Sequence, residues 1–321
     1  MYTCKICGNS ASNKSYIARE MMFGYGDEFE YFECGECGCL QIKQVPDNLE
    51  KYYPESYYSF SKQQNGSFVR ALKYLVTSQT VNYYLLGRNI IGLLLSKVFG
   101  VPEYCEWIKK AKVNMDSKIL DVGCGIGELL IRMSQHGFCN LTGIDPYIDE
   151  DIIYENGIKI FKREIHEVEN QFDFIMLHHS FEHMSEPLFV FRELYRLLKP
   201  RRFALVRIPV SSSFAWRRYG VNWGQLDAPR HLFLHTPNSI EILAEQAALK
   251  VTDTTFDSTD FQFWSSEQYL RDIPLRDKRS YAENPRKSIF SEKEIGAFKT
   301  RAIELNKNKD GDSACFYLYK E

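Results

Sequence analysis

The amino-acid sequence predicts an α/β fold, with a mostly parallel sheet covered by helices on both faces and a small cysteine-rich ribbon at the N-terminus. From residue 118 onward, short apolar segments alternate with helical ones, which is typical of parallel sheets. Before that, two Cys-x-x-Cys pairs stand close to the N-terminus. We therefore expect a ribbon over residues 1–50, a linker and helical lid over 51–112, and the α/β domain over 113–321, with an insertion at about 260–310.

The ribbon is predicted from two Cys-x-x-Cys-Gly pairs. Each pair can direct two thiolates to one ion, and the glycine after the second cysteine permits the positive φ of that turn. Two pairs predict a closed, structural zinc site. A redox pair or disulfides are the alternatives. Cys39 extends neither pair and is expected to be a packed thiol. The predicted metal ligands are Cys4, Cys7, Cys34 and Cys37.

The segment after the ribbon is predicted to be a linker followed by two helices. Its tyrosines could line the cofactor or substrate cleft, or could pack the ribbon onto the main domain. A polar turn follows at residues 62–66. Residues 68–99 carry apolar side chains at helical spacing, with a break near Gly87. Such a helix pair is more often core or a lid than a contact to a membrane surface or a lipid-linked substrate. The tyrosines are Tyr52, Tyr53, Tyr57 and Tyr58.

In the α/β part, helices are expected at residues 128–136, 187–198 and 236–248. Thr236 and Ser239 give the last of them a capping residue pair, with Pro237 at its first turn. The charged stretch 271–308 contains a capping box from Ser291 to Glu294, which predicts a further helix. Strands are expected at residues 118–122, 141–144, 158–161, 172–177, 203–208, 250–256 and 314–319.

Composition sets broad limits. The chain has 321 residues, with 40 basic and 42 acidic side chains, and this near-neutral balance gives no overall attraction to nucleic acid or membrane. The longest apolar stretch, residues 90–101, is interrupted by Ser96 and Lys97 and is too short to span a bilayer. Nine cysteines without a visible secretion signal favour a reducing, cytoplasmic setting.

The most informative motif is a glycine-spaced turn between the first predicted strand of the α/β domain and its helix. The turn carries Gly123, Gly125 and Gly127, and Asp145 follows a second strand, where it can accept hydrogen bonds from ribose hydroxyls. The spacing differs from the dinucleotide fingerprint, and no phosphate-binding Gly-Lys-Ser/Thr loop is present. Asp121 can hold an amino group. This suits the amino-acid end of S-adenosylmethionine (SAM) better than a diphosphate.

The α/β part contains, in this order, Leu120-Asp-Val-Gly-Cys-Gly-Ile-Gly127, Gly143-Ile-Asp-Pro146, Phe172-Asp-Phe-Ile-Met-Leu177 and Leu197-Leu-Lys-Pro200. Together these four segments resemble the class I SAM-dependent methyltransferases. The resemblance covers roughly residues 115–260 and implies a Rossmann-like, seven-stranded sheet with SAM as cofactor. The chain departs from it after Pro200, where relatives usually carry two glycines and this chain has Arg201 and Arg202.

The loop after the predicted strand 172–177 is rich in histidine, and ligands of open α/β sheets bind at such strand ends. The resemblance places a Glu-His pair here, matching Glu182 and His183. A histidine could take the proton of an acceptor hydroxyl, and we rank His183 first and then His179. Glu182 would orient a histidine, and His178 is assigned to the cofactor. Glu164 is a candidate for the adenine amino group, or a solvated charge.

A second loop, residues 220–237, resembles methyltransferases encoded near sugar and polysaccharide genes. Trp223 could form an apolar floor for a sugar ring, Arg230 could hold a phosphate or carboxylate, and His231 could be a second base. A buried polar loop is the alternative.

The leading hypothesis is an enzyme that methylates a small polar molecule, with the hydroxyl of a sugar, sugar nucleotide or glycan precursor as acceptor. A sugar C-methyltransferase is an alternative. An RNA methyltransferase that grips RNA with the ribbon is another, but residues 24–36 are acidic and disfavour nucleic acid. A non-catalytic relative is disfavoured by the intact set of cofactor residues.

Overall fold

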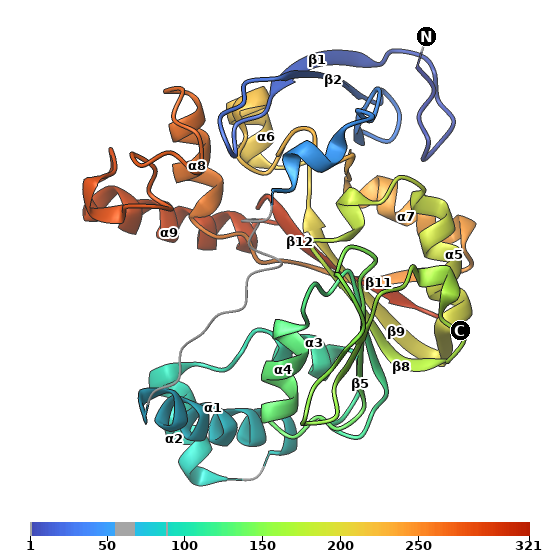
Figure 1. Cartoon of the computed structure of the whole chain (residues 1–321), viewed down its shortest axis with the longest axis vertical. Helices are drawn as coiled ribbons and strands as arrows, with labels where there is room; N and C mark the ends of the chain where they lie inside the picture. Colours follow the sequence, from blue (N-terminus) through green and yellow to red (C-terminus); the bar gives the residue numbers. More distant parts are fainter. Residues whose placement is uncertain (1, 55–67, 88) are drawn as a thin grey trace. The chain divides into compact units, whose positions relative to one another are not determined.

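The computed structural model describes residues 2–54, 68–87 and 89–321 (Figure 1). Tyr57, Tyr58 and the predicted polar turn lie outside the described residues. The chain divides into two compact units, each built from separated stretches. The "ribbon unit" comprises Met1–Pro54, His179–Arg192 and Val206–Leu318. The "glycine-turn unit" comprises Glu55–His178, Glu193–Leu205 and Tyr319–Glu321.

The glycine-turn unit contains the parallel part of the main sheet. β4 pairs in parallel with β5 and β8, and β5 pairs in parallel with β7. The central strands are buried along their length, which explains their continuous apolar sequence. Their bounds are β4 (Ile119–Val122), β5 (Leu141–Ile144), β7 (Lys159–Phe161) and β8 (Phe172–His178).

The described residues give the main sheet eight strands in the order β11-β12-β9-β8-β4-β5-β7-β6. The predicted mostly parallel sheet is therefore confirmed. It has one strand more than expected, because β6 (Ile152–Ile153) adds a two-residue antiparallel edge to β7. β9 (Leu198–Pro209) begins five residues before the predicted strand. β11 (Lys250–Phe256) and β12 (Ser313–Tyr319) lie where expected.

The first two helices of the glycine-turn unit agree with the sequence pattern. α1 (Phe68–Leu86) and α2 (Ile90–Phe99) are interrupted near Gly87, and the Asn89 side chain caps α2 by accepting two backbone hydrogen bonds. The α2 residues Ile90 and Val98 are 78% and 75% exposed. No helix in the described stretches is both long and apolar enough to cross a membrane.

α3 (Tyr104–Lys110) is a helix that the sequence analysis did not predict. It buries Tyr104, Trp107 and Ile108, whose spacing is helical but too short to be recognised as a pattern. α4 (Glu128–Gln135) follows the glycine turn, as expected. α5 (Pro187–Leu197) also matches its predicted range to within one residue.

The ribbon unit begins with an antiparallel sheet of β1 (Lys14–Arg19), β2 (Glu28–Glu33) and β3 (Leu40–Ile42). Its fourth strand, β10 (Phe233–Leu234), comes from the far end of the chain and pairs with β3, with Leu234 opposite Leu40. The sequence did not predict β10, because a two-residue strand has no periodicity. The short helix η1 (Leu49–Tyr52) follows the ribbon strands.

Helices complete the ribbon unit. α7 (Pro237–Gln246) and α9 (Glu292–Lys307) were predicted, and both capping boxes are formed. α6 (Phe214–Tyr219) and α8 (Phe261–Tyr269) were not predicted. Both contribute to a buried cluster that also contains ribbon residues, because α6 supplies Trp216 and α8 supplies Phe263 to the core around Tyr31. Burial of these aromatic side chains stabilises the short elements.

Candidate functional site

The glycine turn connects β4 to α4 within the glycine-turn unit. Gly123, Gly125 and Gly127 all have positive φ, so side chains would be strained at each of them. Asp145 follows β5, and its two carboxylate oxygens accept hydrogen bonds from the backbone N–H groups of Gly125 (2.8 Å) and Tyr147 (2.9 Å). Asp145 therefore fixes the turn as well as standing beside it. The structure brings these predicted cofactor residues together.

Asp121 lies at the end of β4 and is 3% exposed. Burial and, to a smaller extent, the negative charge of Asp145 together raise its pKa to about 7. A buried carboxyl beside a second carboxylate favours a cationic ligand, because a cation stabilises its charged form. The amino group of SAM is such a cation.

The other two predicted cofactor residues lie elsewhere in the glycine-turn unit. His178 ends β8, and its ring packs against the indole of Trp107 with ring centroids 4.3 Å apart. Glu164 is exposed and forms a capping box with Glu167 at a short helix, which occupies its carboxylate with backbone contacts. A role for either residue in cofactor binding stays a prediction.

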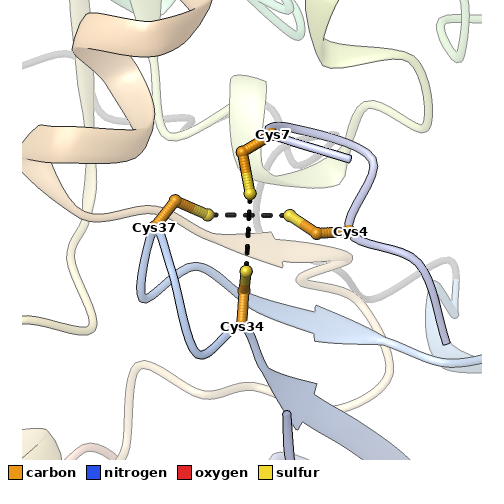
Figure 2. A group of neighbouring side chains, drawn as sticks. All are labelled: Cys4, Cys7, Cys34 and Cys37. Carbon is orange, nitrogen blue, oxygen red and sulfur yellow. Dashed lines mark hydrogen bonds between the residues drawn. The ribbon is translucent and has the colours of Figure 1, made fainter. Parts of the chain in front are cut away.

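The four predicted zinc ligands form one cluster in the ribbon unit (Figure 2). The Sγ atoms of Cys4 and Cys37 are 3.6 Å apart, and those of Cys7 and Cys34 are 3.5 Å apart. In a tetrahedral site with Zn–S bonds of about 2.3 Å, sulfur atoms lie about 3.8 Å apart, so the cluster fits a zinc ion. Cys39 lies outside the cluster and is fully buried.

Donors around the sulfurs suit thiolates. The side-chain amide of Gln41 donates to Cys4 Sγ at 2.9 Å, and backbone N–H groups of Ile6 and Glu36 approach the sulfurs of Cys4 and Cys34 at 3.4 and 3.5 Å. Hydrogen bonds to coordinating sulfur are the usual second layer of a structural zinc site.

The histidine-rich loop forms a second cluster in the ribbon unit. Glu182 is fully buried, and neither of its carboxylate oxygens accepts a hydrogen bond in the described residues. The Nδ1 of His179 lies 3.3 Å from Glu182 Oε1, and the Nε2 of His231 lies 3.9 Å from it. The rings of His183 and His231 have centroids 4.8 Å apart. Three predicted catalytic histidines and Glu182 therefore converge.

Electrostatics in this cluster follow from burial and from its neighbours. Burial of Glu182 favours the neutral acid, but His179 and the other histidines outweigh this effect and lower its pKa to about 2. Burial lowers the pKa of His231 to about 4, and His183 acts in the same direction. The backbone of His179 has a φ of 50°, a left-handed conformation that is uncommon outside glycine and is often held at functional sites.

The protonated ring nitrogen can be assigned for two of the histidines. Nδ1 of His183 lies 2.8 Å from the carbonyl oxygen of Arg230, and Nδ1 of His231 lies 2.7 Å from that of Gln225. A carbonyl can only accept, so Nδ1 carries the hydrogen in both rings. Nε2 of each ring therefore offers a lone pair. The hydroxyl of Tyr53 also approaches Nδ1 of His183, at 3.1 Å.

The predicted substrate residues lie in the interior of the ribbon unit. Trp223 is fully buried and donates its indole N–H to Asp312 at 2.9 Å. Arg230 is also fully buried and forms ion pairs with Glu20 (2.9 Å) and Asp227 (2.6 Å). Both side chains have structural partners of their own. Substrate binding by either residue stays a prediction, and the geometry gives both a structural task.

Sequence reasoning missed two residues that shape this loop. Glu20 lies about two hundred positions from its partner Arg230, and no local pattern announces it. Its carboxylate also accepts backbone hydrogen bonds from Met22, Phe23 and Tyr25. Tyr53 belonged to the predicted tyrosine-rich linker, but its contact with His183 depends on the fold.

Comparison with known proteins gives one family match. A family model described as a methyltransferase domain matches residues 97–254. A "ubiquinone biosynthesis O-methyltransferase" of Pseudomonas aeruginosa is 34% identical over 110 residues, which cover 31% of this chain and 47% of that protein. The "EEF1A lysine methyltransferase 2" of Mus musculus is 46% identical over 40 residues, covering 12% and 16%.

The chain thus spans about half the length of the first of these relatives. Among solved structures, the magnesium protoporphyrin IX methyltransferase of Synechocystis PCC 6803 with bound S-adenosylhomocysteine is similar, with 12% sequence identity and a TM-score of 0.43. The match covers 86% of this chain and 95% of that one.

Proposed function

We propose that the protein transfers the methyl group of SAM to a hydroxyl of a small polar molecule, because residues 97–254 match a family model described as a methyltransferase domain. The observation that carries the proposal is the constellation of Asp121, the positive-φ glycines and Asp145 at the ends of β4 and β5. In this proposal Asp121 holds the amino group of SAM and Asp145 accepts the ribose hydroxyls.

We propose a sugar, sugar nucleotide or glycan precursor as the acceptor. The support is the resemblance of the loop that contains Arg230 to methyltransferases from sugar and polysaccharide gene neighbourhoods. Transfer to oxygen is also supported by the name of the Pseudomonas relative, an O-methyltransferase. The lysine methyltransferase of the mouse has a nitrogen acceptor in its name, so the family match alone does not select the acceptor atom.

The proposed chemistry is an in-line displacement at the methyl carbon. A histidine takes the proton of the acceptor hydroxyl, the oxygen forms a bond to the methyl carbon, and the bond from that carbon to the sulfonium breaks, releasing S-adenosylhomocysteine. The candidates for the base are His183, His179 and His231. Burial of His231 favours the first two, whose side chains are partly exposed.

We further propose that Cys4, Cys7, Cys34 and Cys37 hold a structural zinc ion. Four closely spaced sulfurs with donors around them support it, and a closed site of four thiolates leaves no open position for substrate. Zinc there would supply folding energy to the ribbon and take no part in methyl transfer.

Calorimetry with SAM and a labelled-methyl transfer assay test the proposal. The protein should bind SAM with one site, and Asp121→Ala should weaken that binding strongly. Sugar nucleotides, simple phenols and RNA should be offered in parallel as acceptors. Failure to bind SAM would refute the proposal. Transfer to RNA alone, with a steep dependence on salt, would favour the RNA methyltransferase instead.

A sugar C-methyltransferase with the same SAM-binding residues remains an alternative. The position of the label in the product distinguishes transfer to carbon from transfer to oxygen. Acid-stable label on carbon would favour C-methylation. Label in a methyl ether would favour the proposed oxygen acceptor. The His183→Ala variant should retain SAM binding while losing turnover if His183 is the base.

A further inference from the structure

The cluster of Glu182, His183 and His231 presents one ligand atom from each side chain, and these atoms all lie within 4.8 Å of one another. We infer that this cluster is a binding site for a divalent transition-metal ion, separate from the four cysteines. The inference concerns metal binding itself. The role given to the ion below rests on the proposed function.

His183 and His231 each have one ring nitrogen with a lone pair that is available to a metal ion. Because Nδ1–H of His183 and of His231 donates to a backbone carbonyl, each ring keeps its lone pair on Nε2. Metal-binding histidines usually donate their second ring nitrogen in this way, which fixes both the tautomer and the ring orientation. A ring that served only as packing would not need a fixed acceptor nitrogen beside a carboxylate.

Glu182 is a buried carboxylate that lacks hydrogen-bond donors among the described residues. Its side chain is fully buried, yet neither oxygen accepts a hydrogen bond from the described residues. A buried carboxylate without donors is costly, and a cation is the usual compensation. The nearest histidine, His179, is 3.3 Å from Oε1 without hydrogen-bond geometry, and its side chain is 31% exposed.

Buried negative charges outnumber buried positive charges around this cluster, which also favours a further cation. Arg230 is the only buried guanidinium of the group, and it faces two carboxylates, Glu20 and Asp227. Together with Glu182, three buried carboxylates meet one buried cation. Asp227 Oδ2 lies 3.9 Å from Nε2 of His231, so it faces the same ring nitrogen as Glu182. A divalent ion would balance the excess negative charge.

Two nitrogens and one carboxylate select the class of ion. Imidazole and carboxylate suit zinc, iron(II), manganese(II) and cobalt(II), and such sets of three leave coordination positions open. Bonds of about 2.0–2.2 Å place ligand atoms about 3–4 Å apart, and the separation of 3.9 Å between His231 Nε2 and Glu182 Oε1 is close to this range. With the ion bound, Nε2 of His183 is a ligand and cannot also take the proton of the acceptor, so His179 would be the base in that case. An oxygen of the acceptor could take an open position on the ion and become more acidic there.

The test uses the full-length protein with its cysteine site filled with zinc, and titrates it with Co²⁺. We expect one equivalent of Co²⁺ to bind and to give visible d–d absorption without a thiolate-to-cobalt charge-transfer band. Glu182→Gln and His183→Asn should each weaken Co²⁺ binding at least tenfold. The matched controls Glu186→Gln and His166→Asn, both exposed, should bind Co²⁺ like the unchanged protein.

Three outcomes would overturn the inference. They are uptake of no second ion by the unchanged protein, binding of Co²⁺ with the thiolate band only, and binding of Co²⁺ by Glu182→Gln as tight as in the unchanged protein. Circular dichroism of each variant separates loss of a ligand from loss of the fold. SAM calorimetry on the same samples keeps the two proposals apart. SAM binding without Co²⁺ binding removes the metal site alone, and Co²⁺ binding without SAM binding removes the proposed function alone.

Discussion

The surroundings of Asp121 should make the affinity for SAM depend on pH. Its pKa is raised to about 7 by burial and by Asp145, so in the free protein it is largely neutral below pH 7. The ammonium group of SAM favours the charged form. Affinity for SAM should therefore rise roughly tenfold between pH 6 and 7.5, with release of a proton on binding, as calorimetry in buffers of different ionisation enthalpy would measure.

As the pH rises, Asp121 affects folding stability in the opposite direction to SAM affinity. A carboxyl with a raised pKa holds its proton better in the folded than in the unfolded protein, so without SAM this residue contributes less to stability as the pH rises from about 4 to 7. Asp121→Asn should remove both effects, leaving weak and pH-independent SAM binding. The exposed Asp116→Asn should keep the pH dependence. A pH-independent affinity in the unchanged protein would remove Asp121 from SAM binding.

Arg201 shows what the departure from the family pattern costs. The resemblance to class I methyltransferases implies glycine there, and Arg201 adopts a φ of 59°, which favours glycine. We expect Arg201→Gly to raise the free energy of unfolding by about 1 kcal/mol in urea titrations. Arg202→Gly should do the reverse, because Arg202 pairs with Asp173 at 3.1 Å. A loss of stability in Arg201→Gly would show that its side chain matters more than its backbone.

A variant of Trp223 would distinguish a structural role of this residue from a role in substrate binding. Trp223→Phe removes the indole N–H that is bonded to the buried Asp312, and we expect a loss of about 1–3 kcal/mol in the free energy of unfolding. KM for the acceptor should stay within twofold if Trp223 acts only in the interior. A stable variant with a much higher KM would instead place Trp223 at the substrate.

At this scale the sequence predicts residues that belong to a local motif. Asp121 and Asp145 could be predicted because Asp121 stands near the end of one strand and Asp145 directly follows the next, and the structure places both at the glycine turn. Glu20 could not be predicted, because its partner Arg230 is distant in the chain. The exposure of Trp223 could not be read from its position in a polar loop, since tertiary packing decides burial.

Among the elements, the ribbon sheet is the most instructive. The strand β10 lies beside β3, and the hydroxyl of Thr236 donates to the carbonyl oxygen of Cys37 at 2.7 Å. The cysteine site is therefore bonded to the start of α7. Tyr31 of β2 also donates to the carbonyl oxygen of His231 at 2.9 Å. Loss of zinc should reach the histidine cluster through these bonds.

Removal of the metal tests this connection. Cys34→Ser, or treatment with a strong chelator, should abolish one equivalent of zinc in elemental analysis and speed amide exchange in β1, β2 and β3. Exchange should also accelerate at Phe233 and Leu234 of β10. Cys139→Ser, at an exposed cysteine outside the cluster, should keep the zinc and the slow exchange. Unchanged exchange in β10 after zinc loss would refute the coupling.

Long elements were predictable and short ones were not. The ranges of β5 and β11 match the sequence prediction, because four to seven apolar or alternating residues give a clear period. α6, α8 and β10 were missed. Their residues are held by the aromatic core of the ribbon unit, so their structure depends on distant contacts rather than on local propensity.

On the scale of the whole molecule, the two units should respond to different ligands. SAM should slow amide exchange in β4, the glycine turn and β5, all in the glycine-turn unit. Zinc should slow exchange in the ribbon unit. Hydrogen exchange with each ligand alone would measure this, and a thermal melt should shift upward with SAM concentration by mass action. Protection of the ribbon cysteines by SAM alone would contradict the assignment of the sites.

Each unit is built from separated stretches of the chain. This explains why the sequence predicts the strands of the sheet better than it predicts which strands belong to which unit. Strand and helix alternation is local, whereas β9 and β12 each contribute residues to both units. No period in the sequence marks such a crossing. The histidine loop illustrates this, since His178 and His179 are consecutive but belong to different units.

The pairing of β3 with β10 also constrains how such a chain can diverge. A segment that folds alone can be gained or lost in one recombination event, as many small zinc modules are. Here the ribbon and the loop that carries His231 share a sheet and a hydrogen bond from Tyr31, so a lineage that discarded the first fifty residues would expose the edge of β10. Substitutions in β3 and in residues 227–236 should therefore covary among homologues, and the ribbon should be inherited together with this loop.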